Sequence, residues 1–305
     1  MASVQVTEGE LDFSIPKITK PCKTWYKLFG SLSPTTVPLI ALHGGPGMSH
    51  NYLLSLSSLA SDYSIPVILY DQFGCGNSTH LPEKNGDTDF WTVELFLSEL
   101  DNLLEKLGIG EYDLFGNSWG GMLAAEHAIR QPSKLRRLII ADSPASMSDW
   151  IVAAEGLRKQ LPTDVQSVLD RCERDERTET EEYEKAVMEF YKRHVCRVWP
   201  FPGDVDDTFE SLKRDPTVYH TMNGPSEFYV VGSLKTWDIK SKLHRIKVST
   251  MLLNGRHDEA TDAVVQLYFD AIPRVRWFTF AESSHMPHWE ERELFMERVA
   301  AFLRD

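Results

Sequence analysis

The chain has 305 residues, of which 42% are hydrophobic and 25% are charged, a composition typical of a globular protein. The 45 Asp and Glu residues outnumber the 32 Lys and Arg residues, and the net charge of -13 argues against a nucleic acid as a partner. No stretch approaches the roughly 20 apolar residues that a membrane helix needs, so we expect no membrane partner.

The N-terminal segment, residues 1–30, contains Glu8, Glu10 and Asp12 and lacks the basic flank and apolar run of a secretory signal. A cytoplasmic location is therefore expected. The four cysteines are scattered and form no C-x-x-C pair, so we expect them to be reduced and structural.

Short apolar runs alternate with segments of helix length from about residue 37 onward, a pattern typical of parallel strands joined by crossover helices. The expected helices include residues 92–107, which carry leucines at helical spacing, and residues 120–130, which are rich in alanine. The sequence therefore predicts an α/β fold with a mostly parallel sheet. The expected strands are residues 37–42, 66–70, 112–115, 138–141, 248–254 and 276–280.

This alternation stops between residues 144 and 240, where helical and strongly charged sequence replaces the strand-like runs. We predict that residues 144–240 form a helical cap domain inserted into a core domain of residues 1–143 and 241–305. The acidic run at residues 173–184 is interpreted as a solvated helix face.

A G-x-S-x-G pattern at residues 116–120 follows the strand expected at 112–115 and opens the alanine-rich helix. A strand, a tight turn and a helix are the context that a nucleophile elbow requires, so Ser118 is the candidate nucleophile. Gly116 and Gly120 are expected to be small because a side chain at either position would collide with the neighbouring strand or helix.

A serine hydroxyl needs a base to remove its proton, and His285 is the best placed of the ten histidines. It follows the last expected strand and precedes the last helix. His288 is a close competitor that we expect to pack at the start of that helix. His257 is less suitable because it is adjacent to the candidate acid.

The acid that orients this histidine is expected at the end of the preceding strand, where Asp258 lies. This gives the chain order serine, aspartate, histidine that is typical of such folds. Asp142, at the end of the strand expected at 138–141, is the rival position, and its alternative role is to cap a loop or helix.

Residues 43–47, with the sequence HGGPG, follow the strand expected at 37–42, where a backbone donor to an oxyanion is expected. Glycines let the main chain approach a substrate carbonyl closely. We assign the oxyanion hole to the backbone N–H groups of Gly45 and Trp119.

Four segments together resemble the proline iminopeptidases, most closely the branch that contains the tricorn-interacting aminopeptidase. They are HGGPGMSHNYLL at 43–54, DQFGCGNS at 71–78, the elbow, and MNGPSEF at 222–228. The resemblance extends from about Trp25 to Phe302. Two residues differ from the bacterial branch: Phe73 stands where arginine is usual, and Asn117 precedes the nucleophile.

The resemblance implies an α/β-hydrolase fold and a serine aminopeptidase or amino-acid amidase that needs no metal or organic cofactor. The substrate would be a short peptide or amide that loses its N-terminal residue, often proline, through an acyl-enzyme. Glu227 and Glu259 occupy the positions that bind the substrate amino terminus in similar enzymes. Carboxylates there would offset the lost hydration of the ammonium group.

Two other functions stay open at this point. An esterase or lactonase acting on a small metabolite would use the same serine chemistry without the two glutamates. A non-hydrolytic ligand sensor would keep the pocket but not the reaction, which the presence of Ser118, Asp258 and His285 disfavours. Near these motifs, the aromatic residues are interpreted either as pocket walls or as core: Phe73, Trp119, Phe228, Tyr229 and Trp237. The sequence carries no signal for the oligomeric state.

Overall fold

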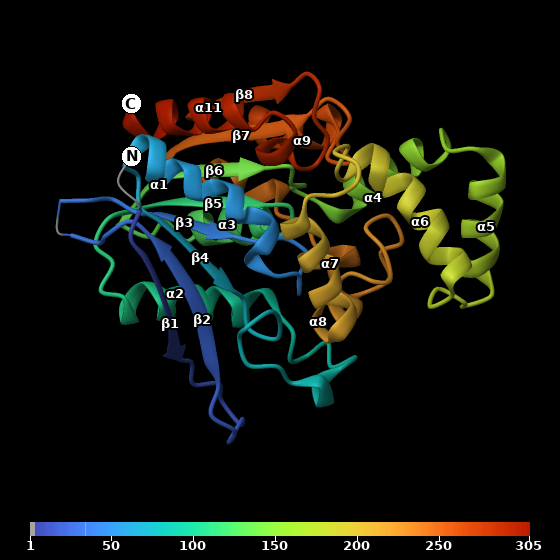
Figure 1. The fold of residues 1–305 in the computed structure, drawn as a ribbon, viewed down its shortest axis with the longest axis horizontal. Coiled ribbons are helices and arrows are strands. Elements are labelled where there is room, and N and C mark those ends of the chain that lie inside the picture. Colours follow the sequence, from blue (N-terminus) through green and yellow to red (C-terminus); the bar gives the residue numbers. More distant parts are fainter. Residues whose placement is uncertain (1–3, 34) are drawn as a thin grey trace.

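The computed structural model describes residues 4–33 and 35–305, and one mixed sheet forms its centre (Figure 1). Residues 1–3 and 34 of the predicted core domain lie outside the described residues. Within the described ranges, eight strands lie in the order β1-β2-β4-β3-β5-β6-β7-β8. The pairings from β4 to β8 are all parallel, which confirms the predicted fold class. The six expected strands are β3 (Leu39–Leu42), β4 (Val67–Asp71), β5 (Tyr112–Asn117), β6 (Leu135–Ala141), β7 (Ser249–Gly255) and β8 (Val275–Phe280).

Two further strands, β1 (Val6–Asp12) and β2 (Lys23–Phe29), form an antiparallel hairpin that pairs with β4 and that the sequence did not predict. Every residue of β1 is at least partly exposed, whereas every residue of β3, β4 and β5 is buried. A strand buried on both faces has an apolar sequence, but a strand at the exposed edge of a sheet does not. The missing apolar signal explains why this hairpin was not expected.

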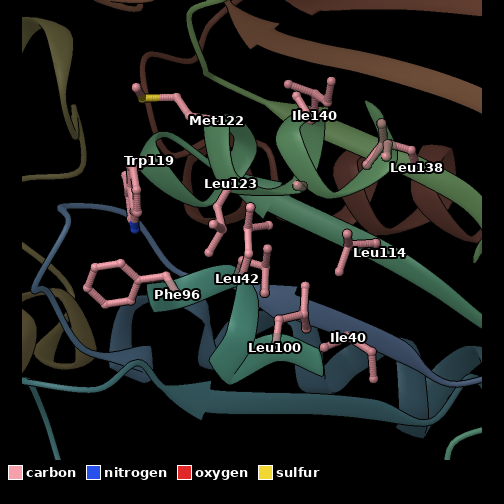
Figure 2. Packing of buried hydrophobic residues seen from close by; sticks show 14 of the residues in the cluster. Ile40, Leu42, Phe96, Leu100, Leu114, Trp119, Met122, Leu123, Leu138 and Ile140 are labelled. Carbon is pink, nitrogen blue, oxygen red and sulfur yellow. The ribbon is translucent and has the colours of Figure 1, made fainter. Parts of the chain in front are cut away.

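One face of the sheet is covered by α2 (Val93–Lys106), α3 (Trp119–Ile129) and α9 (Asp262–Ala271). Ile40 and Leu42 of β3 point toward this layer, because alternate side chains of a strand lie on the same face (Figure 2). Both predicted helices in this region are confirmed as α2 and α3, with ends that differ by one residue.

The opposite face is covered by α1 (Ser57–Tyr63) and α11 (Arg292–Arg304). Leu39 and Ala41 of β3 belong to this second cluster of buried residues. The sheet therefore has an apolar layer on each side, and this packing holds the carboxyl ends of its strands in place. The short helices are α10 (Pro287–Glu290) and the 3-10 helices η1 (His50–Leu56), η2 (Pro82–Lys84), η3 (Ser233–Thr236) and η4 (Lys240–Arg245).

Between β6 and β7 the chain forms five α-helices and the 3-10 helices η3 and η4, in the part where helical sequence was expected. Figure 1 shows the α-helices beyond the carboxyl ends of the strands, with α5 and α6 farthest from the sheet. That this segment is a separate domain with boundaries at residues 144 and 240 stays a prediction. The α-helices are α4 (Met147–Arg158), α5 (Thr163–Arg174), α6 (Glu181–His194), α7 (Gly203–Arg214) and α8 (Thr217–Met222). None of the helices in the described ranges combines the length and the apolar character that a bilayer crossing would need.

The acidic run at residues 173–184 is not one helix face, because α5 ends at Arg174 and α6 begins at Glu181, so the run crosses the turn between two helices. Its first residue, Glu173, accepts hydrogen bonds from Arg158 Nη1 at 2.7 Å and from the Tyr183 hydroxyl at 3.1 Å. Glu173 therefore joins α4 to the α5–α6 pair. The other acids of the run are exposed, as expected for a solvated run: Asp175, Glu176, Glu179, Glu181, Glu182 and Glu184.

Candidate active site

Ser118 lies in the turn between β5 and α3, with φ of 56° and ψ of −124°. Positive φ is strained for a residue with a side chain, and such strain persists only where the surroundings enforce it. Here the Ser118 N–H donates to the Ala141 carbonyl at 2.9 Å, and the Ser118 carbonyl accepts from Gly121 N–H at 2.8 Å. The backbone thus has the strained turn that the G-x-S-x-G pattern predicts.

Gly116 and Gly120 have no room for a side chain. A Cβ atom at Gly116 would lie 2.1 Å from the Gly120 carbonyl oxygen, and one at Gly120 would lie 2.1 Å from the Leu42 carbonyl oxygen. Both contacts are with backbone, which does not rotate away. The close approach of β5, α3 and β3 therefore depends on these two glycines, as the sequence predicted.

The loop after β3 lies against the turn that carries Ser118. Gly45 has φ of +116°, and a Cβ atom there would lie 2.7 Å from the backbone nitrogen of Met48. Gly45, Ser118 and Trp119 line one pocket. The two residues assigned to the oxyanion hole are thus neighbours of the candidate nucleophile.

His285 and Asp258 meet in the loops after β8 and β7. The distance from His285 Nδ1 to Asp258 Oδ1 is 2.6 Å, and Asp258 Oδ1 also accepts from Ala260 N–H at 2.8 Å. A carboxylate only accepts, so the imidazole donates from Nδ1, and Nε2 of neutral His285 is left to accept a proton. His285 lines a pocket together with Ser118.

Burial of His285 disfavours the imidazolium, but the Asp258 carboxylate and its hydrogen bond outweigh this effect. The pKa of His285 is therefore raised above its ordinary value. This environment stabilises the imidazolium that forms when the ring accepts a proton, which is what a general base next to a serine needs.

The two rival histidines lie elsewhere. His288 Nε2 is 3.1 Å from the carbonyl oxygen of Tyr52, and burial lowers the His288 pKa to about 3, so this ring is neutral and packed in the core. His257 is partly exposed, and its N–H donates to the Ser283 carbonyl. The structure therefore pairs His285 with the acid, in agreement with the choice made from the sequence.

Asp142 directly follows β6, as expected. Among the described residues, Asp258 and not Asp142 forms the hydrogen bond with the His285 ring. Its Oδ2 atom accepts from Asn117 Nδ2 at 2.8 Å, and its side chain is fully buried. Asp142 therefore pairs with Asn117 beside the candidate nucleophile, whereas Asp258 is the acid that contacts His285.

Glu227 lies in the segment after α8 and lines both pockets that contain Ser118. Its Oε1 atom accepts from the Tyr219 hydroxyl at 2.7 Å, and its carbonyl accepts from Trp150 Nε1 at 2.8 Å. Burial raises the pKa of Glu227, although the Tyr219 hydroxyl partly opposes that effect. The carboxyl group is thus held rigidly beside the candidate nucleophile.

Glu259 follows Asp258 and lines the same pocket as Ser118. The side chain is fully buried, and neither carboxyl oxygen has a hydrogen-bond partner among the described residues. Its Oε1 atom lies 3.8 Å from His285 Nε2. Burial and the neighbouring Glu227 and Asp258 carboxyls raise its pKa well above the ordinary value. A buried acid without a partner is costly, so this arrangement favours a cationic ligand.

The loop at residues 71–78 supports the site from behind. Asp71 Oδ1 accepts from the His50 backbone N–H at 2.7 Å, and Gln72 Oε1 accepts from Trp119 Nε1 at 2.8 Å. Burial raises the pKa of the Cys75 thiol well above its ordinary value, which keeps it protonated and unreactive. These contacts confirm that this loop is scaffold.

Of the aromatic residues considered as pocket walls, Trp119 lines the pocket, while others pack elsewhere. Phe73 stacks edge-on against Phe13, Phe228 lies against Phe190, and Trp237 Nε1 donates to Glu126. Helices α4, α6 and α7 supply further wall residues that no local motif in the sequence indicates. They are Met147, Trp150, Tyr191 and Phe209.

Comparisons with known proteins agree with this geometry. A family model described as the alpha/beta hydrolase fold matches residues 37–292. A proline iminopeptidase from Saccharolobus solfataricus is 36% identical over 92% of this chain and 88% of its own length. Among solved structures, VinJ is 49% identical with a TM-score of 0.93, and the Mycobacterium smegmatis proline iminopeptidase is 45% identical with a TM-score of 0.88. Each alignment with these two structures covers 98% of both chains.

Proposed function

The chain belongs to the proline iminopeptidase family of α/β hydrolases, and we propose that it is a serine aminopeptidase. It releases an N-terminal proline or another apolar residue from short peptides, and by the same chemistry it cleaves amino-acid amides. The observation that carries the proposal is the placement of two buried carboxyl groups, those of Glu227 and Glu259, in the pocket that contains Ser118.

The chemistry begins when the Ser118 hydroxyl oxygen attacks the carbonyl carbon of the first residue while His285 Nε2 takes the hydroxyl proton. The C–N bond then breaks, and His285 gives that proton to the leaving amine. Water hydrolyses the resulting acyl-enzyme by the same proton transfers in reverse. Asp258, 2.6 Å from Nδ1, orients the ring throughout.

The negative charge that develops on the substrate carbonyl oxygen needs donors that are already in place. We assign this role to the backbone N–H groups of Gly45 and Trp119, which flank Ser118 in the pocket. Trp119 is the first residue of α3, so the positive end of the helix dipole adds to the stabilisation.

The substrate ammonium group binds between Glu227 and Glu259. Support for this step comes from the burial of both acids and from the unpartnered oxygens of Glu259. Burial favours the protonated acids in the empty pocket, and a bound ammonium favours their ionised forms. Binding of the cation therefore releases protons from the pair.

The side chain of the first residue lies against apolar walls that include Met122, Met147, Trp150 and Leu234. Their chemistry supports an apolar first residue such as proline. The cytoplasmic location inferred from the N-terminal sequence and the placement in the branch with the tricorn-interacting aminopeptidase are also proposals.

Three related substrates test the proposal: prolyl arylamide with a free amine, its N-acetylated analogue, and a small neutral ester. We expect kcat/KM for the free amine to exceed that for the acetylated analogue by about 100-fold or more, because the acetyl group removes the charge that the acids bind. Equal rates would favour an esterase. Failure of a fluorophosphonate probe to label Ser118 would favour a ligand sensor.

A further inference from the structure

Asp258, the acid that contacts His285, has a second buried carboxyl group as its neighbour, that of Asp142. Asp142 follows β6 and Asp258 follows β7, and these strands are neighbours in the sheet. The two side chains are within hydrogen-bonding reach of each other. Asp142 Oδ1 and Asp258 Oδ2 have no other partner among the described residues. Each acid therefore has one carboxyl oxygen left for a hydrogen bond to the other.

Two carboxylates in contact and out of water repel each other strongly, so such a pair keeps one proton between them. Asp258 already accepts from Ala260 N–H and from His285, as an ionised carboxylate does. Asp142 accepts one bond, from Asn117, on Oδ2. The distribution of donors thus leaves Asp142 Oδ1 as the place for the proton.

The charges around Asp142 agree with this placement. Burial raises the pKa of Asp142 well above its ordinary value, and the nearby acids Asp258 and Glu290 raise it further. The Asn117 amide opposes that effect only in part. The Tyr52 phenol, which reaches Asp142 through Asn117, is itself neutral because burial raises its pKa.

We propose that Asp142 is a neutral positioning residue, which donates a hydrogen bond from Oδ1 to Oδ2 of Asp258 and thereby fixes the carboxylate that orients His285. This role rests on the proposed function of Asp258 and His285. Asp142 touches neither the substrate nor the reacting atoms, and it acts through Asp258.

The same hydrogen bonds continue to the loop that contains Gly45. Gly44 N–H donates to the Tyr52 hydroxyl at 2.7 Å, and this hydroxyl donates to Asn117 Oδ1 at 2.8 Å. Asn117 Nδ2 then donates to Asp142 Oδ2 at 2.8 Å. Asn117, the residue before the nucleophile, therefore connects the expected oxyanion loop to the acid side of the site.

The backbone at Asp142 provides a matched pair of variants. Its φ is 54°, a left-handed conformation that Asn and Gly adopt more readily than other residues. Asp142→Asn keeps a donor toward Asp258 and an acceptor for Asn117. Asp142→Gly fits the same backbone but removes both hydrogen bonds. A difference between the two variants thus reports the side chain and not backbone strain.

We expect Asp142→Gly to lower kcat by about 10- to 100-fold with little change in KM, because a misplaced base slows the chemical step and not binding. Asp142→Asn should retain kcat within about fivefold of the wild-type value. Equal kcat values in both variants and the wild type would overturn the positioning role, as would equal losses in both.

The pH profile gives a second measurement, which serves even if Asp142→Gly does not fold. If Asp142 is neutral in the wild type, Asp142→Asn changes no charge, and the acid limb of kcat/KM stays at the same pH. If Asp142 is ionised, the variant removes an anion near His285 and moves that limb down by about one unit, which would contradict the proposal. Wild-type protein that a fluorophosphonate does not label would instead refute the proposed function.

Discussion

The two ends of the candidate site are built in different ways. The nucleophile end consists of consecutive residues from Gly116 to Gly121 and is fixed by backbone contacts and strain. The amine end brings Glu227 of the segment after α8 to Glu259 of the loop after β7, and both carboxyl groups are buried there. A local motif encodes the first end, whereas the second exists only after the chain has folded.

This difference predicts different consequences for substrates. Damage to the nucleophile end should affect every substrate alike, because every substrate reacts with the same hydroxyl group. Damage to the amine end should affect only substrates that carry a positive charge.

Ser118→Ala removes the attacking oxygen. We expect kcat/KM to fall by about 10⁴-fold or more on the free-amine arylamide and on the neutral ester alike, with the thermal unfolding temperature close to that of the wild type. Turnover within tenfold of wild type on either substrate would exclude this serine from the mechanism.

His285→Ala should lose activity comparable to Ser118→Ala, since members of a triad act as a unit. His288→Ala is the control, because His288 is a buried, neutral ring that binds the Tyr52 carbonyl. We expect this control to lower stability and to leave the ratio of amine to ester activity unchanged. Greater loss of activity in the His288 variant would reverse the assignment of the base.

The pH dependence should separate the two ends without any mutation. His285 must be neutral to accept a proton, and its pKa is raised, so kcat/KM should fall on the acid side at a higher pH than for an ordinary imidazole. The amine substrate should also lose kcat/KM above about pH 8, where its α-ammonium group deprotonates. A neutral ester should show only the acid limb, and an alkaline fall shared by both substrates would contradict the role of the charge.

Glu259→Met should stabilise the protein while it impairs amine recognition, because it replaces an unpartnered buried acid by an apolar side chain of similar size. We expect a gain of about 1 kcal/mol or more. Folding raises the pKa of the Glu259 carboxyl, so this group lowers the free energy of unfolding once the pH exceeds its pKa in the unfolded chain. The gain in stability from Glu259→Met should therefore be larger at pH 8 than at pH 5. Thermal unfolding at both pH values measures this gain. A variant less stable than the wild type at pH 8 would contradict the claim that the buried Glu259 carboxyl group is destabilising.

The sequence predicted the buried sheet strands and the elbow because each is encoded by neighbouring residues. The run at 112–115 is apolar apart from Asp113 because β5 is buried on both faces, and Gly116 and Gly120 mark the contact with α3 and β3. The β1–β2 hairpin was not predicted, because every residue of β1 is at least partly exposed and β2 buries only Thr24, Leu28 and Phe29, so neither strand has a continuous apolar run.

The hydrogen bonds among Tyr52, Asn117 and Asp142 could not be predicted, because these residues are far apart in the chain. Tyr52 and Asn117 are 65 residues apart, and no pattern in the sequence indicates that their side chains meet. Asp142 was considered only as a rival acid or a cap. Its position behind Asp258 follows from the adjacency of β6 and β7, which only the sheet order reveals.

The most direct test of the account compares Glu227→Gln with wild type on two substrates, a free-amine prolyl arylamide and a small neutral ester. Glutamine keeps an acceptor for the Tyr219 hydroxyl but removes the charge, so recognition of the ammonium group should weaken by about 1.5–3 kcal/mol. Glu297→Gln, at an exposed position on α11, is the matched control and should behave as wild type. We expect a loss of about 10- to 100-fold or more in kcat/KM on the amine and little change on the ester. Equal losses on both substrates would contradict it.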